Sequence, residues 1–135
     1  MTSEMSEFLD DLVSVCPEIH SIWLIGSRAN GTATDVSDWD FLAFGSAATL
    51  TCLKRASALH RNDIDFLVIT NGEDFENAWG AKEATGSLSE WHWKPISSMR
   101  ASYTESKLRD DEEGERVVLN PVVQKERNAI RVWPK

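Results

Sequence analysis

The sequence predicts one α/β (α+β) domain, residues 1–135, in which helices flank a mixed β-sheet. A chain of 135 residues suits a single domain and can bury a core without disulfides or a structural metal. Its first half alternates helix-like with strand-like segments, which is typical of a sheet covered by helices. The link between the first two expected strands is about a dozen residues long, which allows an antiparallel as well as a parallel pair.

Two amphipathic helices are expected in the first half of the chain. Residues 4–16 place apolar side chains on one face and acidic ones on the other, with Ser3 or Ser6 as the N-cap. Residues 47–60 carry leucines and an alanine at helical spacing, and Ser46 can cap their first turn. These helices would cover the sheet.

Three runs rich in β-branched and aromatic residues predict strands at 19–25, 39–44 and 64–70. Each run stops at glycine, serine or asparagine, which are typical turn residues. Residues 27–34, between the first two runs, are small and polar. They predict a loop that contains one short helix.

The second half is expected to add strands to the sheet. Phe75 and Trp79 are spaced as i,i+4 partners, which predicts a short helix after Gly72. Residues 88–96 and 100–106 are predicted to be extended segments on either side of a polar turn. The sheet would then continue beyond its first three strands.

The C-terminal region begins with a charge run and ends with apolar segments. Residues 109–116 are charged except for one glycine, and predict a solvated loop. Residues 117–119 and 122–132 predict a last strand and a short helix. No internal repeat or low-complexity tract interrupts the sequence.

Charge and composition limit the partners. The formal net charge is −8, whereas a protein that holds a nucleic acid by its backbone normally has a basic surface, so no nucleic-acid partner is expected. An anionic NTP would need local help from metal ions or oriented N–H groups. The N-terminus is polar and acidic, and no apolar run approaches the ~18 residues of a membrane span. We therefore expect a cytoplasmic protein without a membrane segment.

Two features have structural interpretations as well as functional ones. Cys16 and Cys52 have no CxxC neighbour and no histidine cluster, and are predicted to be reduced thiols in apolar settings. Trp91, His92 and Trp93 form an aromatic group. That group suits a strand with one face in the core, or a platform on which an adenine stacks.

A glycine–serine pair and two aspartates carry the main chemical signal. Gly26 lets the backbone turn sharply and approach a ligand, and Ser27 offers a hydroxyl and an N–H. A helix that started here would favour a phosphate. Asp38 and Asp40 stand one residue apart at the start of a strand and therefore point to one face, where a divalent cation would relieve their repulsion. Mg²⁺ prefers such carboxylates together with substrate phosphate oxygens.

A third carboxylate lies in the next predicted strand. Asp65 is surrounded by apolar residues, where a carboxylate is unfavourable unless it is paired, hydrogen-bonded or bound to a metal. If this strand neighbours that of Asp40, three carboxylates could surround two metals, as an in-line phosphoryl displacement requires. Asp63 competes for this role, but its place before the strand indicates a turn. Arg28 could contact phosphate or form an ion pair that shapes the loop.

These residues resemble the minimal nucleotidyltransferases of the DNA polymerase β superfamily. The signature of that family is Gly-Ser, ten residues, and Asp-x-Asp. Here Gly26-Ser27 is followed by ten residues and then by Asp38-Trp39-Asp40. The similarity extends over roughly residues 19–70.

The resemblance implies a nucleotidyltransferase fold, here with extra C-terminal strands. Gly26 and Ser27 would hold the triphosphate of an NTP, and Arg28 is a candidate for a further contact. The cofactor would be Mg²⁺ or Mn²⁺. Three acidic residues would bind it and act in catalysis: Asp38, Asp40 and Asp65.

The resemblance also suggests the reaction and its partners. Similar proteins transfer AMP from ATP to a hydroxyl of a small molecule, such as an aminoglycoside, or of a protein, and some are antitoxins that modify a paired helical toxin. This chain ends in strand-like segments instead of the helical acceptor-binding domain of antibiotic-modifying members. We therefore expect a toxin-like protein acceptor or a homodimer more than a small molecule. The alternative is a catalytically silent relative that binds a nucleotide or a partner.

Overall fold

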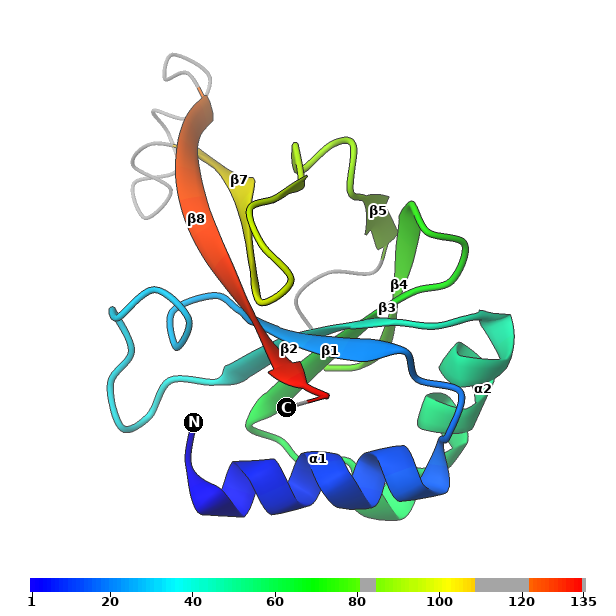
Figure 1. The fold of residues 1–135 in the computed structure, drawn as a ribbon. Helices are drawn as coiled ribbons and strands as arrows, with labels where there is room; N and C mark the ends of the chain where they lie inside the picture. Colours follow the sequence, from blue (N-terminus) through cyan, green and yellow to red (C-terminus); the bar gives the residue numbers. More distant parts are fainter. Residues whose placement is uncertain (81–84, 109–121, 135) are drawn as a thin grey trace.

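In the described part of the chain, two helices cover one face of an eight-stranded mixed sheet (Figure 1). This computed structural model describes residues 1–80, 85–108 and 122–134. The helices are α1 (Ser3–Val15) and α2 (Ala47–Arg55), and a short 3₁₀ helix spans Ser57–Leu59. The strands are β1 (Ser21–Ile25), β2 (Trp39–Phe44), β3 (Ile64–Ile69), β4 (Asp74–Trp79), β5 (Thr85–Ser87), β6 (Lys94–Pro95), β7 (Arg100–Leu108) and β8 (Val122–Trp133). The domain is therefore α+β.

The strands run in the order β5-β4-β3-β2-β1-β8-β7-β6 across the sheet. Among the described strands, only β2 and β3 pair in parallel, and α2 lies in the connection between them. β1 and β2 are antiparallel, which is one of the two arrangements that the short link between them allows. The mixed sheet is as the sequence predicts.

Both helices begin at a side-chain cap. Thr2 caps α1, so the expectation of Ser3 or Ser6 was wrong. Ser46 caps α2 through a capping box, as predicted, but α2 ends at Arg55, earlier than expected. No helix in the described part of the chain has the length and apolar character needed to cross a bilayer.

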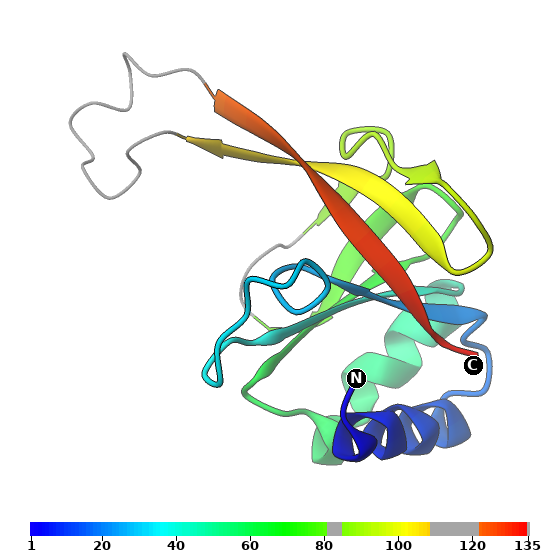
Figure 2. The ribbon, with the colours of Figure 1, turned by 60° about the vertical axis from the view of Figure 1, so that its left-hand side comes forward.

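Hydrophobic cores lie on both faces of the sheet. The first fills the space beneath the helices and includes the fully buried Leu12, Phe41 and Phe66. The second lies on the opposite face, where Tyr103 of β7 packs with Leu42 of β2. Figure 2 shows the long strands β7 and β8 crossing over this region and extending to one side of the domain. Because side chains alternate along a strand, β2 and β3 supply both cores.

Three local predictions of helix were wrong. Phe75 and Trp79 lie on β4, which pairs with β3, and a register shift places Phe75 in the second core and Trp79 in the first. Residues 122–132 belong to β8, which pairs with β1 and β7. Residues 27–34 form turns and irregular structure instead of a short helix. Pairing with neighbouring strands overrides local helical spacing at the first two sites.

The extra C-terminal strands are present. Residues 100–106 lie in β7 as predicted, whereas residues 88–96 are mainly turns that end in the two-residue β6. The predictions for residues 109–116 and 117–119 lie outside the described residues.

Cys16 and Cys52 form a disulfide, so the prediction of two reduced thiols was wrong. Cys16 caps the C-terminus of α1 and Cys52 lies in α2, and both helices pack on the same face of the sheet. Their Cα atoms are 5.9 Å apart although 36 positions separate them in sequence. A search for neighbouring cysteines cannot find such a pair, because packing of the helices creates it.

Reducing this disulfide is expected to lower the free energy of unfolding by about 3 to 4 kcal/mol, because the bond closes a long loop in the unfolded chain. Urea unfolding with and without dithiothreitol measures the effect. A variant with both Cys16→Ser and Cys52→Ser should unfold at one midpoint in either buffer. Equal midpoints for the unmodified chain in the two buffers would contradict the prediction.

Candidate functional site

Asp40 and Asp65 are direct neighbours on the two parallel strands. The register of β2 and β3 pairs Asp40 with Asp65, and the flanking pairs Trp39–Ile64 and Phe41–Phe66 point into the core beneath the helices. Because side chains alternate along each strand, both carboxyl groups lie on the opposite face, away from the helices. The structure thus places two of the predicted carboxylates, Asp40 and Asp65, side by side on neighbouring strands.

Two glycines make room for these carboxyl groups. Gly26 follows β1, and a Cβ at this position would overlap Oδ2 of Asp40. Gly80 follows β4, and a Cβ there would overlap Oδ1 of Asp65. Strands β1, β2, β3 and β4 are neighbours in the sheet. Their ends therefore place four residues in one row across the strands: Gly26, Asp40, Asp65 and Gly80. Gly26 was a predicted site residue, whereas Gly80 was not.

Asp38 stands immediately before β2 and lines a pocket of about 420 Å³ together with Asp65. The pocket lies at the strand ends on the β4 side of the row, because it is also lined by Gly80 and by Trp79, which belongs to the core beneath the helices. Its volume is in the range of small-molecule sites. The structure therefore places all three predicted carboxylates at the same end of β2 and β3, and Asp38 and Asp65 line this pocket.

An aromatic pair forms one wall of the pocket. The rings of His60 and Trp79 stack with centroids 4.3 Å apart and an interplanar angle of 22°. His60 Nε2 lies 2.8 Å from the carbonyl oxygen of Leu53, and since a carbonyl can only accept, Nε2 carries the hydrogen. Neither His60 nor Trp79 was a sequence-predicted site residue, because 19 positions separate them and only the fold stacks them.

Asp63 is held by Arg61 and is not part of the row. Arg61 donates two hydrogen bonds to its carboxylate, Nε at 2.9 Å and Nη2 at 2.7 Å. These hydrogen bonds hold the pKa of Asp63 below its usual value and raise the pKa of Arg61. The Asp63 carbonyl also accepts a hydrogen bond from Trp39 N at 2.7 Å. Asp63 thus has the turn role that its sequence position predicts.

The Gly26–Ser27 turn is held from a distant strand. Gly26 has a φ of +72°, and its N–H donates to the hydroxyl of Tyr103 at 2.9 Å. Asn30 Nδ2 donates to the Gly26 carbonyl at 2.7 Å, and the same side chain accepts from Asn128 N on β8 at 2.7 Å. No helix begins at this turn, so helix N–H groups do not supply the predicted phosphate site. Tyr103 could not be found from sequence, because 77 positions separate it from Gly26.

Arg28 shapes the loop. Its Nε and Nη2 donate to the carbonyl of Ser37 at 3.2 and 2.8 Å, and its guanidinium lies 4.2 Å from the ring centroid of Trp39. These contacts close the loop between β1 and β2 just before Asp38. Arg28 therefore shapes the loop, through hydrogen bonds and a cation–π contact instead of the ion pair that the sequence suggested.

The aromatic group around His92 packs into the protein. Trp91 stacks on Tyr103 with centroids 5.2 Å apart, and Trp93 meets Trp23 edge-on at 5.4 Å. Both belong to the border of the second core, although they stand on a turn instead of the predicted strand. Exposed His92 has a φ of 54° in this turn.

The carboxylates of this site could hold a hard divalent cation only if a bound substrate supplied further oxygen ligands. Mg²⁺ takes one or two protein carboxylates and completes its shell with phosphate oxygens and water. Carboxylates on neighbouring strands fit that chemistry. Within residues 1–80, 85–108 and 122–134, however, no group of three or more His, Cys, Asp or Glu side chains is placed to hold a metal ion. The described carboxylates thus supply at most two ligands for such an ion, and phosphate oxygens and water would complete its shell.

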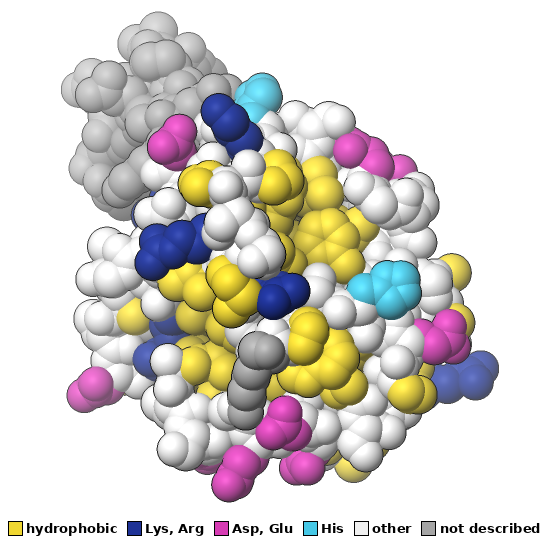
Figure 3. Space-filling view, viewed as in Figure 1, with side chains coloured by type: hydrophobic (Ala, Val, Ile, Leu, Met, Phe, Trp, Pro, Cys, Tyr) yellow, Lys and Arg dark blue, Asp and Glu magenta, His cyan; other side chains and the backbone are white. Residues whose placement is uncertain are grey.

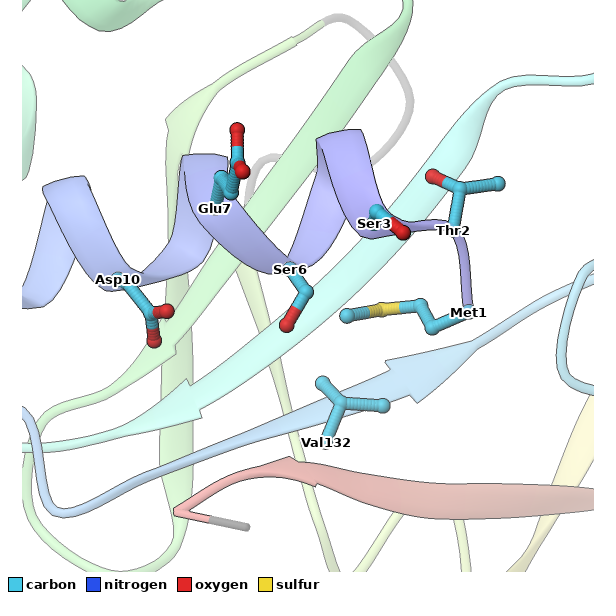
Figure 4. A pocket seen from close by; sticks show the side chains of 7 residues that line it. All are labelled: Met1, Thr2, Ser3, Ser6, Glu7, Asp10 and Val132. Carbon is cyan, nitrogen blue, oxygen red and sulfur yellow. The ribbon is translucent and has the colours of Figure 1, made fainter.

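A second pocket, of about 520 Å³, lies between the N-terminus of α1 and the end of β8 (Figure 4). Its lining includes Thr2, Glu7, Asp10 and Val132. It lies on the helix-covered side of the sheet, whereas the row of carboxylates faces the other side. This pocket therefore does not belong to the site built by Asp40 and Asp65.

Comparison with known proteins finds few similarities. No protein-family model matches the chain, and no curated protein does. Among solved structures, it is similar to the crystal structure of a "putative nucleotidyltransferase" from Sulfolobus solfataricus, with 25% sequence identity and a TM-score of 0.42. The similarity covers 50% of this chain and 65% of that one. A TM-score this low does not establish a shared fold, so a functional interpretation must come from the residues themselves.

Proposed function

We propose that this protein is a metal-dependent nucleotidyltransferase that moves a nucleoside monophosphate, AMP from ATP, onto a hydroxyl group. One observation carries the proposal: Asp40 and Asp65 are register partners on parallel strands, on the face that Gly26 borders. The spacing from Gly26-Ser27 to Asp38-Trp39-Asp40 agrees with it. Carboxylates beside a turn that can hold phosphates are the donors that Mg²⁺ takes together with phosphate oxygens.

The residues of the row would have separate roles. Asp38 and Asp40 would hold Mg²⁺ or Mn²⁺, and Ser27 would contact the triphosphate through a hydroxyl and an amide that have no hydrogen-bond partner among the described residues. When bound, the cation supplies charge neutralisation at the phosphates and a lower pKa for an attacking hydroxyl. Asp65, on the far side of Asp40 from Gly26, would accept the proton of the acceptor hydroxyl.

The pocket beside Asp65 is the proposed entry for the acceptor. An in-line displacement needs the attacking and leaving oxygens on opposite sides of the phosphorus. If Gly26-Ser27 holds the leaving pyrophosphate, the acceptor approaches from the opposite end of the row, where His60 and Trp79 form the aromatic wall. A pocket of about 420 Å³ admits a small molecule or a single protein side chain, so it is compatible with either acceptor class.

The test uses the purified chain with ATP labelled at the α-phosphate, in Mg²⁺, in Mn²⁺ or in EDTA. A cell extract is divided by ultrafiltration into small molecules and proteins, and each fraction is offered as acceptor. We expect metal-dependent pyrophosphate release and transfer of label into one fraction, because the cation links nucleotide to carboxylates. EDTA should abolish both signals.

Calorimetry of ATP binding in Mg²⁺ separates the remaining outcomes. Binding without pyrophosphate release in either fraction would favour the silent nucleotide-binding relative over the enzyme. No detectable binding of ATP would refute both.

A further inference from the structure

We propose that Tyr103 and Arg127, from the C-terminal half of the chain, complete the wall that binds the triphosphate at the Gly26–Ser27 turn. This inference rests on the proposed function and assigns to the last two strands a part in the nucleotide site. The ligand class is a polyphosphate anion, and the residues are a tyrosine hydroxyl and a guanidinium.

The first step is that Tyr103 occupies a donor of the turn. The N–H of Gly26 points at the Tyr103 hydroxyl, at 2.9 Å, so this amide already has a partner where the sequence suggested a phosphate contact. Tyr103 is 5% exposed, and its ring stacks on Trp91. Because the ring is buried, it holds the Tyr103 hydroxyl in place next to the Gly26–Ser27 turn.

The second step is that Arg127 lies beside Tyr103. The register of β7 and β8 pairs these two residues directly, and directly opposed side chains in an antiparallel pair are close neighbours on one face. Ala101 and Ala129, the next pair on that face, are fully buried in the second core. The Nε atom of Arg127 is also buried. The cation is therefore held against the protein, on the same face as Tyr103.

The third step is that the turn and β8 are fixed to each other next to Arg127. Asn30 forms two hydrogen bonds with the backbone of Asn128, accepting from its N at 2.7 Å and donating to its carbonyl at 3.1 Å. The same Asn30 amide donates to the Gly26 carbonyl. Asn30 thus links Gly26, the neighbour of Ser27, to Asn128, the neighbour of Arg127.

The fourth step concerns charge. A triphosphate at Ser27 would lie next to Asp40 in a chain of net charge −8, so it needs a local cation besides a metal ion. Arg127 is the cation that the register of β7 and β8 places beside Tyr103. Figure 3 shows several Lys and Arg side chains, with an acidic one among them, on the side of the molecule that β7 and β8 occupy, and further acidic ones near α1. A guanidinium suits phosphate oxygens because it binds them through two parallel N–H groups.

The test measures binding of Mg²⁺ with ATP, with AMP and with inorganic tripolyphosphate by calorimetry. Arg127→Met should weaken ATP and tripolyphosphate by about 10- to 100-fold, the loss expected for a charge-assisted contact, and leave AMP nearly unchanged. Arg127→Lys should recover part of the affinity. Tyr103→Phe keeps the ring and should weaken the same two ligands by a smaller factor, about 3- to 10-fold.

The matched control is Arg100→Met. Arg100 is exposed, lies on the same strand pair and points to the opposite face, because it pairs with Ile130. It should bind all three ligands like the unmodified chain. If Arg127→Met does not fold, as judged by circular dichroism, Arg127→Lys and Tyr103→Phe provide the test.

The outcomes separate this inference from the function on which it rests. If the unmodified chain binds ATP and both Arg127→Met and Tyr103→Phe bind it equally well, the inference is wrong and the proposed function stands. Equal losses for AMP and tripolyphosphate would indicate a general structural defect and would also overturn it. If the unmodified chain binds no ATP, the proposed function and this inference both fail.

Discussion

Asp40→Asn is expected to reduce nucleotidyl transfer by about three orders of magnitude while leaving the fold intact. The substitution keeps the size of the side chain but removes the negative charge that a divalent cation needs, and metal-assisted charge stabilisation contributes several kcal/mol to such reactions. The amide also removes the repulsion between two like-charged neighbours on β2 and β3. Pyrophosphate release and thermal unfolding measure the two effects.

Asp63→Asn is the matched control for this prediction. It makes the same chemical change two positions from Asp65, on a carboxylate that is bound by Arg61 and does not join the row. This variant should retain activity near that of the unmodified chain. If Asp63→Asn lost as much activity as Asp40→Asn, or if Asp40→Asn stayed active, the row of carboxylates would not be the catalytic site.

Gly80→Ala is expected to lower the free energy of unfolding by about 2 to 5 kcal/mol, combining strain at positive φ with overpacking. Gly80 has a φ of +103°, a region that residues with a Cβ rarely adopt. A Cβ there would also overlap the Asp65 carboxylate and lie 2.8 Å from the Asp65 Cα. The backbone atom cannot move aside as a flexible side chain could, so the strand end or the carboxylate must shift. Urea unfolding measures the loss.

Gly72→Ala separates the two contributions. Gly72 also has a positive φ, +85°, but a Cβ there would meet nothing within 4 Å. Its substitution should therefore cost only the backbone part, about 1 kcal/mol. Equal losses for Gly80→Ala and Gly72→Ala would show that Gly80 is not packed against Asp65, and would remove one boundary of the proposed site.

The local residue pattern predicted most of the strands and helices in the first half of the chain. Runs of β-branched and aromatic residues predicted β1, β2 and β3 because they lie in the centre of the sheet, where both faces are covered and the pattern is unambiguous. Ser46 predicted the start of α2 because a cap acts within one turn. Asp40 could be singled out by its spacing from Asp38 and from Gly26-Ser27, and Asp65 because a carboxylate between apolar neighbours in a strand needs a reason to be there.

The second half shows why local pattern can mislead. The spacing of Phe75 and Trp79 fits an i,i+4 helix, but pairing with β3 makes this segment a strand, and a register shift in that pairing separates the faces of the two residues. The structure then places these two side chains in different cores, which a helix face could not do. Residues 122–132 are a strand for the same reason, since β1 and β7 lie on either side of them.

By itself, the sequence determined the acidic residues, the glycine–serine turn and the strands that carry them, because each depends on neighbours a few positions away. The tertiary structure alone decided that Asp40 and Asp65 are register partners, that Tyr103 holds Gly26, that His60 stacks on Trp79 and that Cys16 joins Cys52. These contacts join residues 19 to 77 positions apart. Their formation depends on how the strands order themselves and how the helices pack, which no local pattern encodes.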